Sequence, residues 1–104
     1  MATGNISVIP NLVAALENIQ TITSGSINDL TDGGVYFLSG VSNCPSGTYG
    51  FCITLVAEHP YLRQIFMRSG TPGTNDGNIY TRTASSKSSS AWGSWWKFTG
   101  EYVS

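Results

Sequence analysis

Charged side chains are scarce in this sequence. Lysine and arginine occupy 5 of its 104 positions, aspartate and glutamate occupy 6, and charged residues make up 11% of the chain, against an average of about 25%. With a formal net charge of −1, the chain offers no basic patch for the phosphate backbone of nucleic acid. Nucleic acid is therefore excluded as an expected partner.

Long apolar runs are also missing. No run approaches the roughly 20 residues that cross a bilayer. The amino end lacks the basic stretch and apolar block of a secretion signal. We therefore expect no membrane insertion.

The side chains that carry out chemistry in enzymes are few and scattered. The one histidine, His59, precedes a proline in a predicted turn and has no nucleophile paired with it in the sequence. The carboxylates are spread along the whole chain, and the spacing of Cys44 and Cys52 does not match a zinc site. We expect no catalytic residues, no cofactor and no metal.

Small polar and flexible residues take the place of charge. Serine, threonine and glycine occupy 14, 11 and 12 positions, while apolar residues make up 40% and aromatic residues 12% of the chain. This composition is typical of a turn-rich β protein and not of a disordered chain. A chain of 104 residues has room for one core.

Helical periodicity is confined to the amino end. Four aliphatic side chains there are spaced 3, 4 and 3 residues apart, namely Ile9, Leu12, Leu16 and Ile19. They predict a helix from Pro10 to Thr21, within a stalk over residues 1–25. A helix of about 12 residues is marginal alone in water, so the stripe must lie on the chain's own sheet or against other copies. The stripe fills a and d heptad positions, and we expect a short trimeric coiled coil.

From residue 26 onwards, short alternating runs separated by turn residues predict a β-rich knob over residues 26–104. The expected strands are 34–39, 51–57, 61–68, 78–83 and 92–98, with polar loops at 43–50 and 69–77. The predicted fold class is mainly β, a small antiparallel sandwich or sheet preceded by one helix. The loop at 69–77 is a candidate binding surface.

Three tryptophans stand close together near the carboxyl end. In a regular strand, Trp92, Trp96 and Phe98 would share one face, and Trp95 and Lys97 the other. We expect Trp92 and Trp95 to serve the core, because large aromatic side chains carry much of the burial energy of a small domain. Trp96 is then free to contact a ligand or a neighbouring subunit, or to pack on the helix stripe.

The most specific pattern combines a Tyr80-x-Arg82-Thr83 strand with a following Trp92-x-x-Trp95 segment. Further matching residues are Asp29-Leu30, Gly34-Val35-Tyr36-Phe37, Asn43 and Pro45, Tyr49-Gly50, Leu55-Val56 and Gln64-Ile65. Together they resemble the knob domain found near the tips of bacteriophage fibres and R-type pyocin fibres. The sequence departs from that pattern at Trp96, where lysine or arginine is common, at Cys44 and Cys52, and in the long linker at 85–90.

The resemblance implies a non-enzymatic, homotrimeric fibre knob that attaches to glycans on a host cell. Its expected partners are its own copies, other fibre, baseplate or capsid proteins, and host surface polysaccharide. Its expected location is the virion, at a fibre tip or on the capsid surface, after synthesis in the host cytoplasm. The alternative is a structural or decoration subunit that caps and trimerises the fibre without binding a ligand.

Sugar recognition needs flat aromatic faces beside amide, carboxylate or guanidinium groups. The residues that offer these groups on or beside the loops are Tyr61, Arg63, Asn75, Asp76, Asn78 and Trp96. Two alternatives stay open for residues 75–78, a plain turn and a calcium site.

Cys44 and Cys52 enclose a short polar loop. A disulfide between them would stabilise the fold by about 2 to 3 kcal/mol. The alternative is a pair of free thiols, with Cys52 packed as a small apolar residue. We favour free thiols, because a virion protein folds in a reducing cytosol.

Overall fold

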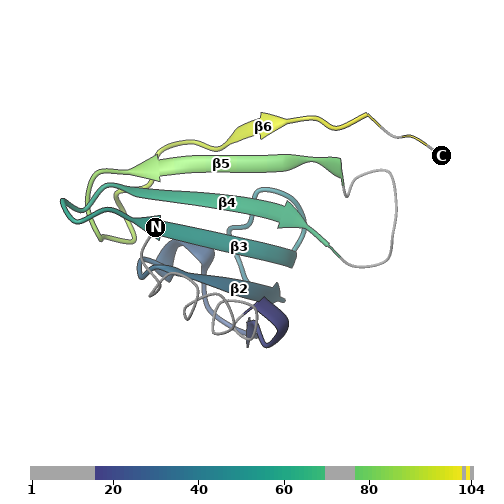
Figure 1. The fold of residues 1–104 in the computed structure, drawn as a ribbon, viewed down its shortest axis with the longest axis horizontal. Coiled ribbons are helices and arrows are strands. Elements are labelled where there is room, and N and C mark those ends of the chain that lie inside the picture. The colour runs from purple at the N-terminus through teal and green to yellow at the C-terminus, as the bar shows by residue number, and fades with distance from the viewer. Residues whose placement is uncertain (1–15, 70–76, 102, 104) are drawn as a thin grey trace, which may run out of the picture.

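The computed structural model describes residues 16–69, 77–101 and 103. Within them, one sheet holds six strands in sequence order (Figure 1): β1 (Gln20–Ile22), β2 (Gly34–Ser39), β3 (Tyr49–Val56), β4 (Leu62–Arg68), β5 (Ile79–Ala84) and β6 (Trp96–Phe98). The turn η1 (Ile27–Asp29) lies between β1 and β2. Strand β1 is parallel to β2, and the other neighbouring pairs are antiparallel. The predicted mainly β class is confirmed, as a mixed sheet.

The helix predicted from Pro10 to Thr21 is wrong at its C-terminal end. Within the described part, only Leu16 and Glu17 of that range are helical, and the chain then enters β1. Pairing with β2 gives this segment backbone hydrogen bonds, and it lets Ile22 pack against the core. These gains outweigh a helix that is marginal by itself.

The trimeric coiled coil is not seen in the part of the chain that the structure describes. Of the four stripe residues, Ile9 and Leu12 lie outside the described residues. Leu16 is 50% exposed and Ile19 is half-buried. Because β1 begins directly after Ile19, the helical seam is shorter than predicted.

The inner face of the sheet carries the core. Alternate residues of β2 to β5 are buried on this face, namely Leu38, Gly50, Cys52, Thr54, Leu62, Gln64, Phe66, Tyr80, Arg82 and Ala84. Ile27 of η1 and Val41 of the following loop pack onto this face, and both are fully buried. Gly50 cannot carry a side chain here, because a Cβ atom would lie 2.7 Å from the Phe66 ring.

Arg82 and Gln64 form a buried polar pair within this core. Arg82 Nε donates to Gln64 Oε1 at 2.9 Å, and Gln64 Nε2 donates to the carbonyl oxygens of Ile27 and Leu30, both at 3.1 Å. Gln64 is fully buried and Arg82 is 5% exposed. One amide therefore joins β4, β5 and η1 away from water, where an unpaired polar group would be costly.

Trp92 and Trp95 close over the guanidinium group of Arg82. Its Cζ atom lies 4.5 Å from the ring centroid of Trp92 and 4.2 Å from that of Trp95, within cation–π range. Trp92 Nε1 also donates to the carbonyl oxygen of Asn28 at 3.0 Å. The two tryptophans therefore serve the core, as predicted.

The prediction that Trp92 shares a face with Trp96 and Phe98 is wrong. Residues 93–95 are not in a strand, and β6 begins only at Trp96. Strand alternation therefore does not extend back to Trp92. The pairing with β5 places Trp96 and Phe98 on the outer face, whereas Trp92 lies over Arg82 on the inner face.

We expect Gln64→Leu to lower the free energy of unfolding by about 2 to 4 kcal/mol. The substitution leaves the buried Arg82 without its acceptor and two carbonyl oxygens without their donor. Urea unfolding followed by tryptophan fluorescence measures the change. The control is Gln20→Leu at an exposed position of β1, expected to change stability by less than about 0.5 kcal/mol. Equal losses in the two variants would contradict the role given to Gln64.

Candidate functional site

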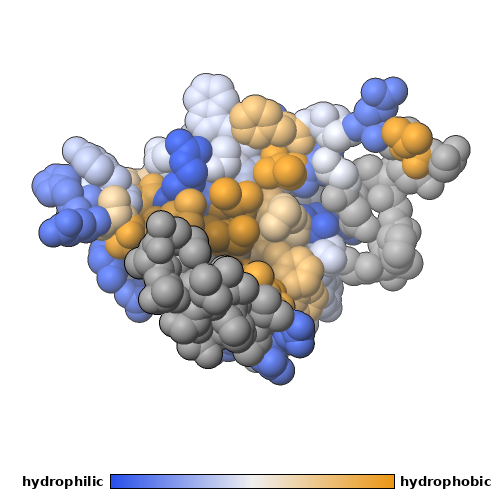
Figure 2. Space-filling model, in the orientation of Figure 1, coloured by the Kyte–Doolittle hydropathy of each residue, from blue (hydrophilic) through white to orange (hydrophobic). Residues whose placement is uncertain are grey.

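The outer face of the sheet is unusually apolar. Two rows of paired residues cross it from β2 to β6, namely Val35, Ile53, Ile65, Thr81 and Trp96, and Phe37, Phe51, Met67, Ile79 and Phe98. Figure 2 shows the hydrophobic side chains gathered across the strands on this face. We call these ten residues the apolar rows. Three of their members on β5 and β6 are exposed, namely Ile79 at 43%, Trp96 at 70% and Phe98 at 61%, while Thr81 is half-buried.

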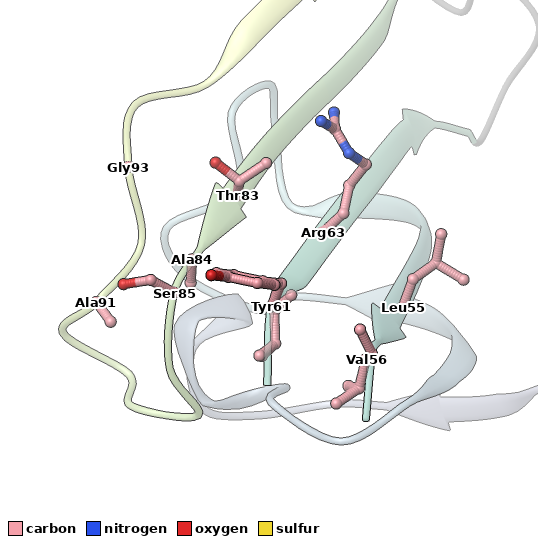
Figure 3. A pocket seen from close by; sticks show the side chains of 11 residues that line it. Leu55, Val56, Tyr61, Arg63, Thr83, Ala84, Ser85, Ala91 and Gly93 are labelled. Atoms are coloured by element: carbon pink, nitrogen blue, oxygen red, sulfur yellow. The ribbon is translucent and has the colours of Figure 1, made fainter. Parts of the chain in front are cut away.

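An open hollow lies at one end of this face. Its floor is the next row of the sheet, where Leu55, Arg63 and Thr83 are paired across β3, β4 and β5. Tyr61 and the segment from Ser85 to Gly93 also contribute to its wall, and the volume is about 770 Å³. Arg63 lies between Leu55 on one side and Tyr61 and Thr83 on the other (Figure 3).

Contacts with neighbouring residues hold two of the polar side chains of the hollow, Arg63 and Tyr61. Arg63 Nη1 donates to Thr81 Oγ1 at 3.0 Å, and Thr81 Oγ1 donates to the carbonyl oxygen of Gln64 at 2.9 Å. The Tyr61 ring makes an edge contact with His59 at 5.1 Å between centroids, yet Tyr61 remains 61% exposed. The hollow thus presents an aromatic ring and a guanidinium group to solvent.

The structure brings three of the six predicted site residues to one face. Tyr61 and Arg63 line the hollow. Trp96 lies on the same face, because it pairs with Thr81, the residue that binds Arg63. Asn78 is at the opposite end of β5, where its Oδ1 accepts from the backbone of Gly100 at 3.3 Å. Asn75 and Asp76, with most of the 69–77 loop, lie outside the described residues.

Sequence reasoning missed Leu55 and Thr83 as lining residues. Each occupies an outward position of an alternating strand, which is visible in the sequence. Their place beside Arg63 depends on the register between three strands. No local pattern gives that register.

The two cysteines are free thiols, and burial makes both of them poor nucleophiles. Burial raises the pKa of Cys44 and that of Cys52 to about 11, and a thiol reacts as its thiolate. Among the described residues, no group of three or more His, Cys, Asp or Glu side chains could hold a metal ion. The outer face offers aromatic rings and hydrogen-bonding groups for non-covalent binding.

Comparisons of the chain with protein-family models, curated proteins and solved structures find no match. In the part of the chain that the structure covers, no helix has both the length and the apolar character to cross a membrane. What the chain binds is therefore inferred from its own residues.

We expect iodoacetamide at pH 8 to alkylate the native protein on the order of 100 times more slowly than the urea-unfolded protein. A thiol with a pKa of about 11 carries about 0.1% thiolate at that pH, against about a quarter for an unfolded cysteine with a pKa of about 8.5. Mass spectrometry counts the labelled thiols. The unfolded chain should be alkylated at both cysteines without a reductant, because neither thiol is in a disulfide. Equal alkylation rates in the native and unfolded protein would contradict the conclusion that burial makes the thiols unreactive.

Proposed function

We propose that this chain is a non-enzymatic fibre knob of a phage or phage-tail-like particle and that it attaches to host cell-surface glycans. The observation that carries the proposal is the open hollow in which exposed Tyr61 lies beside Arg63 on an otherwise apolar sheet face. The fibre part of the proposal rests on the sequence resemblance. The glycan part rests on the chemistry of the hollow.

The hollow suits a saccharide of one or two rings. Its volume of about 770 Å³ lies within the usual range of small-molecule sites. Tyr61 and Leu55 offer apolar surface to the C–H side of a sugar ring, while Arg63 and the hydroxyl groups of Thr83 and Ser85 can bind sugar hydroxyls. Trp96 extends the aromatic surface on the same face.

A homotrimer is part of this proposal. A single open site binds a sugar weakly, and three tethered copies raise the avidity through a high effective concentration of sites.

Tyr61→Ala should weaken binding to glycans on an array by about fivefold to tenfold, because the sugar loses its aromatic contact. Trp96→Ala should give a smaller loss at the edge of the same surface. The control is Tyr49→Ala, which removes a tyrosine of similar exposure, 53% against 61%, at the far end of β3. If the unaltered protein binds glycans on the array and Tyr61→Ala binds them equally well, this placement of the site is contradicted.

The second candidate is a structural cap that binds no ligand, and the apolar rows favour it. Exposed apolar surface of this extent marks a protein contact in many soluble proteins, and the most exposed of its members, Trp96 and Phe98, lie at the edge strand.

Competition for host cells separates the two candidates. If the chain binds glycans, the purified protein should reduce adsorption of the particle to its host in a concentration-dependent way, and Tyr61→Ala should compete less. If the chain is a cap, neither protein should change adsorption.

A further inference from the structure

The hollow carries one charged side chain, and that charge is positive. Figure 3 draws the side chains of the 11 residues that line it, and Arg63 is the only charged residue among them. Glu58 and His59 line a second hollow, which shares Ala57 and Tyr61 with this one. The electrostatic potential of the hollow is therefore set by a cation without a counter-charge in its own wall.

The guanidinium group of Arg63 is held in place by a neutral partner. Thr81 Oγ1 accepts one hydrogen bond from Nη1, and Thr81 is itself fixed by its bond to the carbonyl oxygen of Gln64. An arginine has five N–H donors in a planar fork, so most of that fork is left for a ligand. Lys87, in contrast, is paired with Asp32 at 2.7 Å.

The apolar surroundings strengthen the preference for an anion. Leu55, Val56 and Tyr61 are among the residues that line the hollow, and an ion pair beside apolar surface is screened less than one in open water. Arginine binds carboxylate and phosphate groups through two parallel hydrogen bonds, which are stronger than bonds to a neutral hydroxyl. A neutral sugar would leave this advantage unused.

We propose that the hollow selects an anionic sugar, whose carboxylate or phosphate group pairs with Arg63 while its ring lies against Tyr61 and Leu55. This inference rests on the proposed glycan-binding function and names the class of glycan. It places charge recognition at Arg63 and shape recognition at the aromatic ring. The two contributions are therefore separable by mutation.

The test compares matched acidic and neutral probes with the full chain. The probes are oligogalacturonate and its carboxyl-reduced form, sialyllactose and lactose, and a phosphomannan and its dephosphorylated form. We expect the acidic member of at least one pair to bind about fivefold or more tightly than its neutral counterpart at low salt. The preference should shrink as salt is raised, because added ions screen the exposed pair. The pairs that show it distinguish carboxylate from phosphate as the source of charge.

Variants then assign the preference to one side chain. Arg63→Gln should abolish the difference between the matched probes, whereas Arg63→Lys should keep part of it. The control is Lys97→Gln, which removes the same charge from β6 at the residue paired with Tyr80, on the opposite face of the sheet. Thermal unfolding of each variant confirms that the fold is intact.

The possible outcomes distinguish a failure of this inference from a failure of the proposed glycan-binding function. Equal binding of acidic and neutral probes, or an acidic preference that survives in Arg63→Gln, overturns the inference and leaves the glycan site in place. Failure of the unaltered protein to bind any of these probes or any glycan on an array overturns the proposed function, and the inference with it.

Discussion

The hydrogen bond between Arg82 and Gln64 is the interaction on which the rest of the structure depends. Through Gln64 it joins the centre of the sheet to the turn η1, and through the rings over Arg82 it holds the segment before β6 against the inner face. Burial lowers the pKa of Arg82 to about 10, so the buried charge costs stability. Two tryptophan faces and a charge-assisted hydrogen bond offset that cost.

This internal network explains the most specific sequence pattern of the chain. Tyr80 and Arg82 point into the core from β5, and Trp92 and Trp95 close over the guanidinium group. Four residues of the pattern, Tyr80, Arg82, Trp92 and Trp95, therefore meet a packing requirement, whereas Thr83 lines the hollow on the outer face. The proposed recognition of a ligand falls to the outer face, where Tyr61, Arg63 and Trp96 are exposed to solvent. Two related chains could share this pattern and still bind different glycans.

Local patterns predicted the strands well. Alternation and turn residues gave β2 at its observed bounds and placed β4 and β5 within a residue of theirs, because each strand has one buried face. The pattern also identified the exposed aromatic and cationic residues. Tyr61 and Arg63, two positions apart, line the same hollow because they project from the same side of one segment.

Non-local pairing accounts for what the sequence could not predict. The helical periodicity near Ile19 is overridden by the pairing of β1 with β2. No local pattern in either strand predicts that the two strands pair. Trp92 was assigned to the wrong face because residues 93–95 leave the strand to close over Arg82. Likewise, the meeting of Leu55, Arg63 and Thr83 depends on the register of three strands.

The central claim is that one face of the sheet holds the fold together and the other binds a sugar. Nuclear magnetic resonance of the ¹⁵N-labelled chain during titration with an acidic oligosaccharide tests it most directly. The account predicts shifts of the amide signals of Tyr61, Arg63 and Thr83 and of the indole signal of Trp96, with the indole signals of Trp92 and Trp95 unmoved. Shifts confined to Trp92 and Trp95 would show that the ligand binds the face assigned here to the core, and would contradict the account.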